Sequence, residues 1–184
     1  MSKPSPAEAA ATLARWQSEE AAVRARMGER GVSRREDVAH LTGMELFEGI
    51  FEGRLPWAPI GETLDFVPLH IEPGLAVFQG RPNFRHYNPL GTVHGGWYAT
   101  MLDSCVACAV HSMLPAGKSY TTVELKINLV RALTDKVPLV RAEGRLIHLG
   151  RSMGTADGRL VGHDGTLYAH ASTTCFILDT APPR

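Results

Sequence analysis

The sequence has little cysteine, no excess charge of either sign and no long uncharged apolar run. Three cysteines are too few, and odd in number, for a disulfide framework, which favours a reducing, cytoplasmic location. Nineteen Lys plus Arg residues balance nineteen Asp plus Glu residues, which argues against a nucleic-acid binder and a polybasic membrane-surface protein. No apolar run reaches the ~18 residues that a membrane helix requires, and the N-terminus has no apolar signal core.

The 184 residues suffice for one globular domain with a short extension. Residues 7–30 are rich in alanine and place apolar residues at helical spacing, which predicts a helix that ends near Gly31. A charged linker over residues 32–40 would follow. We therefore predict an N-terminal helical extension over residues 1–40 and the main domain over residues 41–184.

The main domain has a mixed pattern of helices and strands. A short helix is predicted over residues 44–51 and a long one over residues 95–114. Strand-like segments form a hairpin before the long helix and two further pairs after it, over residues 63–71, 75–80, 120–130, 139–149, 152–162 and 166–178. A single long helix among so many strands must be covered by them. The pattern predicts an α+β fold in which an antiparallel sheet wraps around one central helix.

The long helix is apolar nearly all round, as is typical of a buried helix. Asp103 nevertheless lies in its middle, and the segment contains no Lys or Arg. Burying an unpartnered carboxylate is costly, so the residue either has hydrogen-bond donors, points at solvent or serves a function. Taken alone, Asp103 leaves these interpretations open.

The start of the same helix favours a functional role. It contains His94, Gly95 and Gly96, and the two glycines let another group approach the backbone closely. The N–H groups of a first helical turn have no intrahelical partner and lie at the positive end of the helix dipole. They are therefore suited to hold an oxyanion or a polarised carbonyl.

Gly95 and Asp103 cannot act on one carbonyl from the same helix. Eight residues separate them, which corresponds to about 12 Å along the axis and about 80° around it. If they act together, Asp103 must come from a second subunit, with the two helices antiparallel across a two-fold axis. A shared function thus predicts a dimer with two sites at its interface.

The stretch Asn88-Pro-Leu-Gly-Thr-Val-His-Gly-Gly96, followed by Asp103, resembles the signature of hotdog-fold thioesterases of the phenylacetate-degradation (PaaI) type. Residues 120–128, 150–152 and 173–178 support the resemblance, which extends over residues 41–178. It implies a hotdog fold and the hydrolysis of acyl-CoA to a carboxylic acid and free CoA. It also implies that no metal or other cofactor is used, and that a homodimer or homotetramer has its active sites at the dimer interface.

The resemblance implies a role for each matching residue. The Gly95 N–H would polarise the thioester carbonyl, and Asp103 would act as general base on water or as nucleophile. Asn88 would orient water or the carbonyl, and His94 would bond near the thioester sulfur or brace the Asn88 loop. The Thr122 hydroxyl would hold Asp103 or the water, with the preceding threonine as the alternative.

Contacts with the substrate and its CoA portion are expected from Gly96, Gly150, Arg151, Ser152, Arg131 and Trp97. A guanidinium such as that of Arg151 suits the CoA phosphates, and Arg131 is the weaker candidate for that task. Trp97 is either a packing residue or a wall of the acyl pocket.

Other functions compete with this hypothesis. Cys105 and Cys108 form a C-x-x-C without a second pair, and the histidines lack ligand spacing, so a redox or metal site is not predicted. An enoyl-thioester hydratase or dehydratase would place an Asp and a His five residues apart at the helix start, where this sequence has no such pair. A non-catalytic acyl-CoA-binding module is allowed by the fold. It would not need a buried carboxylate beside the thioester.

Overall fold

The computed structural model describes residues 3–180. The helices are α1 (Pro6–Arg24), α2 (Arg35–Val38), α3 (Gly43–Phe51), α4 (Ile60–Thr63), the 3-10 helix η1 (Phe84–His86) and α5 (Gly95–His111). The strands are β1 (Phe66–Glu72), β2 (Leu75–Gly80), β3 (Lys118–Leu129), β4 (Val140–Leu149), β5 (Met153–Gly162) and β6 (Leu167–Asp179). No helix in this part of the chain is both long and apolar enough to cross a membrane.

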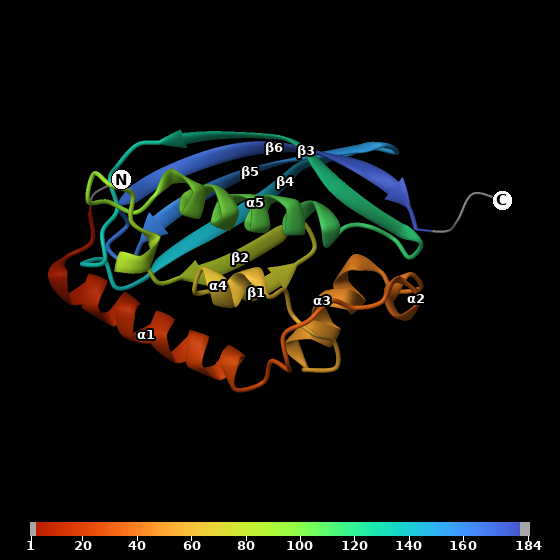
Figure 1. The fold of residues 1–184 in the computed structure, drawn as a ribbon, viewed down its shortest axis with the longest axis horizontal. Helices are drawn as coiled ribbons and strands as arrows, with labels where there is room; N and C mark the ends of the chain where they lie inside the picture. Colours follow the sequence, from red (N-terminus) through yellow and green to blue (C-terminus); the bar gives the residue numbers. More distant parts are fainter. Residues whose placement is uncertain (1–2, 181–184) are drawn as a thin grey trace.

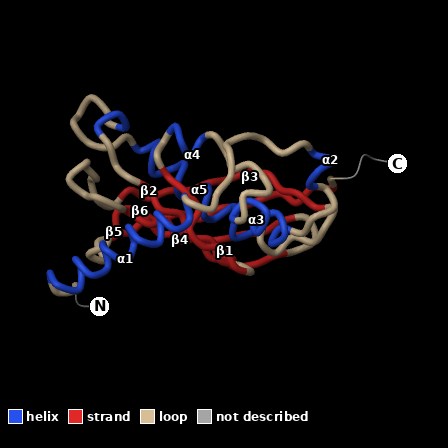
Figure 2. Tube along the Cα trace, turned by 90° about the horizontal axis from the view of Figure 1, so that it is seen from below, coloured by secondary structure: helices blue, strands red, loops and turns tan. Residues whose placement is uncertain are grey.

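The strands form one antiparallel sheet in the order β1-β2-β4-β5-β6-β3. Figure 1 shows that the sheet curves over α5, while α3 and α4 lie on the side of α5 that the sheet leaves open. The expected α+β architecture, one sheet wrapped around one long helix, is confirmed. The tube in Figure 2 shows the same arrangement from below, with α1 and α3 in front of the strands.

Glycines in the sheet allow α5 to lie directly on the strands. A Cβ at Gly144 in β4 would stand 2.3 Å from the Cys105 carbonyl oxygen, and one at Gly158 in β5 would stand 2.6 Å from a Val106 methyl group. Any side chain at these two positions would push the helix away from the sheet. The close approach fixes the depth at which α5 lies, and with it the position of Asp103.

Helix α1 packs on the outer face of the sheet, opposite α5. On β2, Phe78 faces the core while its neighbour Gln79 is buried against α1 and donates to the Trp16 carbonyl oxygen at 3.2 Å. Adjacent residues of a strand point to opposite faces, so α1 and α5 lie on opposite sides of β2. The guanidinium of Arg141 on β4 stacks 4.3 Å from the centre of the Trp16 ring.

Helix α1 ends earlier than predicted, at Arg24 instead of near Gly31. After it, the chain turns and pairs with residues 56–57 through a parallel bridge between Arg30 and Trp57. The turn passes so close to Gly53 that a Cβ at Gly28 would stand 2.8 Å from the Gly53 carbonyl oxygen. Packing against the main domain therefore overrides the helical propensity of residues 25–30.

Two further boundaries differ from the sequence-based prediction. The predicted linker contains the short helix α2, and the strand predicted from residue 63 begins only at Phe66. Before it, Pro59 leads into helix α4, because a proline at a helix start gives up no intrahelical hydrogen bond. The remaining predicted strands and the long helix are confirmed to within a few residues.

The buried acid Glu20 anchors α1. Its side chain is 3% exposed and accepts hydrogen bonds from Gln79 Nε2 at 2.6 Å, Arg24 Nε at 2.8 Å and Arg81 Nη2 at 3.1 Å. Burial by itself raises the pKa of Glu20, but the hydrogen bonds from Arg24 and Gln79 and the charge of Arg81 outweigh it and leave the pKa below 4.5. The ionised form of Glu20 therefore stabilises the folded state.

We expect Glu20→Gln to lower the free energy of unfolding at pH 7 by about 2 kcal/mol, the contribution of hydrogen bonds to a charged group. The pKa of Glu20 is lower in the folded state than in the unfolded state. The difference in unfolding free energy should therefore have its full size above pH 4.5 and shrink as acid protonates Glu20. Urea unfolding at pH 7 and at pH 3 measures it. Glu36→Gln, at an exposed ion pair with Arg34, is the control and should change little. An equal loss of unfolding free energy at pH 7 and pH 3 would contradict stabilisation by the ionised Glu20.

Candidate active site

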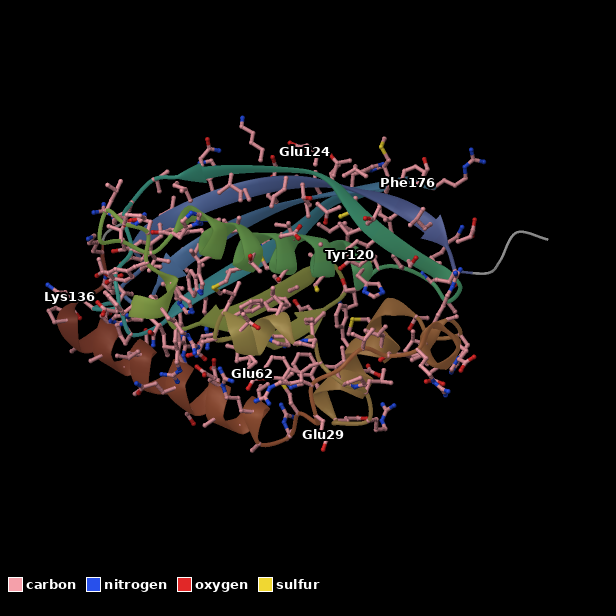
Figure 3. All side chains as sticks on the ribbon, in the orientation of Figure 1. Glu29, Glu62, Tyr120, Glu124, Lys136 and Phe176 are labelled. Carbon is pink, nitrogen blue, oxygen red and sulfur yellow. The ribbon has the colours of Figure 1, made fainter. Side chains whose placement is uncertain are left out.

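The carboxylate of Asp103 is held by a hydroxyl from the neighbouring strand. Thr122 on β3 donates to Asp103 Oδ1 at 3.0 Å. Thr121, the alternative considered from the sequence, is exposed and pairs with Phe176, whose side chain lies on the outer side of the sheet (Figure 3). Among the described residues, Asp103 has no ion-pair partner within 4.0 Å.

Asp103 and Thr122 lie in the wall of a cavity of about 270 Å³. The cavity is lined by residues of α5, β3, β1, β2 and the segment that carries α3 and α4. Its other lining residues are mostly aliphatic or aromatic, namely Phe47, Ile50, Phe51, Trp57, Ala58, Ile60, Gly61, Phe66, Pro68, Phe78, Ser104, Ala107, Cys108 and Tyr120. A carboxylate in the wall of an otherwise apolar cavity is an arrangement typical of an active site.

Three titratable side chains at or beside this cavity, Cys108, Tyr120 and His111, are neutral at pH 7. Burial raises the pKa of Cys108 to about 12, and the charge of Asp103 adds to that shift. Burial also raises the pKa of Tyr120, which lines the cavity below β3 (Figure 3), well above its usual range. His111 stacks near Tyr120, and burial lowers its pKa to about 4. Asp103 thus supplies the one carboxylate among the described residues that line the cavity.

The start of α5 presents a free backbone donor. His94 is the N-cap, and its Nδ1 accepts the Gly96 N–H at 2.9 Å. The Gly95 N–H has no hydrogen-bond partner within the part of the chain that the structure describes. A Cβ at Gly95 would stand 3.1 Å from Leu129 Cδ1. The donor that the sequence pointed to is therefore available for a ligand.

Asn88 shapes the loop before α5. Its Oδ1 accepts the Leu90 N–H at 2.9 Å, and its Nδ2 donates to Thr92 Oγ1 at 3.1 Å. The backbone of Asn88 pairs with Thr92 as well. The side chain thus closes a turn that leads into the helix start.

Trp97 belongs to the core and is not among the residues that line the cavity. Its indole Nε1 donates to the Leu64 carbonyl oxygen at 2.8 Å, and its ring stacks on His86 at 5.6 Å. The structure thus favours the packing role that the sequence left as one alternative. The aromatic wall of the cavity comes instead from residues 47–66. In the sequence, the only signs of this wall were the helical spacing of its apolar residues and a tryptophan flanked by prolines.

The remaining candidate residues lie beside two different parts of α5. Thr122 pairs with Cys175, which pairs with Gly154, so the turn of residues 150–152 lies on the Asp103 side, toward the C-terminal end of the helix. Arg131 lies at the Gly95 end, where its carbonyl oxygen accepts the Tyr98 hydroxyl at 3.3 Å. Within one protomer, Gly95, Gly96, Asn88, His94 and Arg131 form one group, and Asp103, Thr122, Gly150, Arg151 and Ser152 form the other.

Nothing in residues 3–180 gathers three His, Cys, Asp or Glu side chains that could hold a metal ion. Cys105 and Cys108 are unbridged, and Cys105 is fully buried against the sheet.

Comparison with known proteins agrees with this geometry. Residues 90–169 match the model of the thioesterase superfamily. No curated protein sequence is a significant match to the chain. The residues matched include the start of α5, Asp103, β3 and the turn of residues 150–152, whereas Asn88 lies just before them.

Solved structures from three bacteria are similar. A phenylacetic acid degradation-related protein of Ralstonia eutropha JMP134 is 30% identical, with a TM-score of 0.65 over 71% of this chain and 98% of that one. A protein of Thermus thermophilus is 29% identical, with a TM-score of 0.57 over 64% and 96% of the two chains. A conserved Pseudomonas aeruginosa protein is 26% identical, with a TM-score of 0.61 over 66% and 94%. The chain belongs to the thioesterase superfamily and has the hotdog fold of that family.

Proposed function

We propose that the protein hydrolyses acyl-CoA thioesters to a carboxylic acid and free CoA. The observation that carries the proposal is the Asp103 carboxylate, held by Thr122 in the wall of an apolar cavity. The acyl group occupies the cavity, and its carbonyl carbon lies at Asp103. The catalytic domain comprises residues 41–184, since α3 and α4 contribute to the cavity whereas α1 packs on the outside of the sheet.

Asp103 acts on the carbonyl in one of two ways. As general base it takes a proton from water, which attacks the carbonyl carbon and displaces the CoA thiolate. As nucleophile it attacks the carbonyl carbon, expels the CoA thiolate and forms a mixed anhydride, which water then hydrolyses to the carboxylic acid and the free Asp103 carboxylate. In both cases the hydrogen bond from Thr122 Oγ1 orients the carboxylate, and negative charge develops on the carbonyl oxygen.

Two subunits complete each site. The Gly95 N–H is the free donor for the developing oxyanion, but it lies about 12 Å along α5 from Asp103. Strand β3 is an edge strand of 12 residues that exposes Val123 and Leu129, a surface on which a second copy can pair. Pairing two β3 strands antiparallel sets the two α5 helices antiparallel as well. Gly95 of the partner subunit then approaches Asp103.

The other candidate residues have roles that fit this dimer. Because His94 Nδ1 accepts the Gly96 N–H, the neutral imidazole carries its proton on Nε2, which would donate to the thioester sulfur. Asn88 holds the loop that presents Gly95 and His94. Arg151 would bind a CoA phosphate from the Asp103 side.

A free-thiol release assay tests the proposal. Purified protein would be incubated with short, medium, long and aromatic acyl-CoAs, and liberated CoA would be followed by a thiol reagent. Release that depends on Asp103 supports the proposal. CoA esters that bind by calorimetry without release from any substrate would instead identify an acyl-CoA-binding module.

The hydrogen bond from Thr122 yields a further prediction. We expect Thr122→Val to lower kcat about tenfold with little change in KM, because the lost donor orients Asp103 and contributes about 1.5 kcal/mol. The matched control is Thr121→Val, one residue earlier on the exposed side of the strand, which should retain wild-type kcat. Steady-state kinetics on one acyl-CoA measures both. Equal effects of the two substitutions would contradict the role of Thr122.

A further inference from the structure

Trp57 forms the boundary between the cavity and an outer groove. It is 8% exposed and lines the cavity together with Phe47 and Phe51. It also lines a groove on the far side, whose other lining residues are Arg24, Met27, Gly28, Glu29 and Arg30. The indole is thus the wall that ends the cavity on the side of the N-terminal extension.

The chain that follows α1 holds Trp57 in place. The Gly31 N–H donates to the Trp57 carbonyl oxygen at 3.0 Å, and the Trp57 N–H donates to the Glu29 carbonyl oxygen at 3.2 Å. The Arg30 guanidinium lies 5.7 Å from the centre of the indole ring. Both backbone polar groups of Trp57 are therefore bonded to residues 29–31.

Helix α4 fixes the ring from another direction. A Cβ at Gly61 would stand 2.4 Å from Trp57 Cζ3, so the ring packs directly on the helix backbone. Glu62 pairs with Arg30 at 2.9 Å and ties α4 to the same segment. Figure 3 shows Glu62 between α4 and α1, and Glu29 at the lower edge of the molecule. The Trp57 ring is therefore held between the backbone of α4 and the residues that follow α1.

The volume of the cavity limits what it can hold. A cavity of about 150 Å³ accepts benzene, which has six carbons. By the same ratio, the present cavity of about 270 Å³ accepts roughly ten carbons. Its lining residues provide no cation that would favour an acyl group with a terminal carboxylate.

We infer that Trp57, held by residues 29–31, ends the acyl pocket and restricts the substrate to apolar acyl groups of about ten carbons or fewer. The inference rests on the proposed function for its substrate. It gives the N-terminal extension a role: the extension positions the residue that selects the acyl chain. Trp57 is a specificity-determining residue, and Arg30 is a positioning residue.

Binding of non-hydrolysable S-alkyl-CoA thioethers with chains of 4 to 16 carbons tests the inference by calorimetry. Each buried methylene should tighten binding about fourfold. We expect this gain to continue up to about ten carbons and then to stop, since further methylenes meet the indole. Affinity that keeps rising through 16 carbons would overturn the inference.

Substitution of Trp57 should change the chain length beyond which affinity no longer increases. We expect Trp57→Ala to extend it by about six carbons, because the indole is larger than the benzene that ~150 Å³ accepts. Trp57→Leu should extend it less and is the second variant if the first does not fold. The matched control is Trp16→Ala, which removes a buried tryptophan of α1 on the face of the sheet opposite the cavity and should leave the limit unchanged.

An unchanged limit in the folded Trp57 variants, or an equal shift in Trp16→Ala, would refute the inference. The thioethers are not hydrolysed, so the result does not depend on turnover. Thiol release without a chain-length limit would support the proposed function and overturn the inference. A chain-length limit that depends on Trp57, without thiol release from any acyl-CoA, would support the inference and overturn the proposed function.

Discussion

Asp103→Ala should abolish thiol release while the protein stays folded. The substitution removes the carboxylate from the cavity wall and leaves the Thr122 hydroxyl without its acceptor. A positioned base contributes about a hundredfold to ten-thousandfold to the rate. We therefore expect kcat to fall at least about a hundredfold, measured on the acyl-CoA that the wild type hydrolyses fastest.

Asp103→Asn separates chemistry from binding. The amide oxygen can still accept the Thr122 hydroxyl, but the side chain no longer takes a proton or attacks a carbonyl. Binding of acyl-CoA should persist and kcat should fall by orders of magnitude. Asp157→Asn, on the exposed outer side of β5, is the control and should be fully active. Near-wild-type kcat in either Asp103 variant would disprove the assignment.

Isotope labelling would distinguish the two mechanisms for Asp103. In a single turnover in ¹⁸O-water, a general base directs the labelled oxygen into the product acid. A nucleophile instead forms a mixed anhydride, and attack of water on the Asp103 carbonyl of that anhydride leaves the label in the Asp103 carboxylate and one of its original oxygens in the product. Mass spectrometry of the peptide that contains Asp103 reads the difference.

Mixing two inactive variants should restore activity if each site is shared. Asn88→Ala disrupts the loop that presents Gly95, and Asp103→Ala removes the carboxylate that faces it from the other subunit. A heterodimer of the two has one site with both defects and one with neither. Random exchange makes half of the dimers heterodimers, so about a quarter of wild-type activity should return.

The control for this experiment is a double variant that carries both substitutions on one chain. Mixed with wild type, it gives heterodimers in which each site has one defect, so activity should drop below the value that simple dilution predicts. Subunit exchange would be verified by differently tagged chains. Verified exchange with no recovery from the single variants would contradict the shared site and place the complete site within one subunit.

The sequence by itself determined the fold class and the local chemistry of the two site regions. Helix α5 was predictable because an apolar run with a glycine pair before it and a proline after it leaves little alternative. Asp103 stood out because it is a lone charge in an apolar helix. The free Gly95 N–H follows from helix geometry, since the first N–H groups of any helix lack intrahelical partners.

The tertiary structure decided what depends on contacts between distant segments. The partner of Asp103 is Thr122 rather than Thr121, because alternate residues of β3 face opposite sides of the sheet and the register with β6 sets which one faces α5. Helix α1 ended at Arg24 since the following residues pair with Trp57, 27 positions beyond Arg30. The cavity itself is a property of five packed elements, and no local pattern in the sequence encodes its volume or the wall that Trp57 supplies.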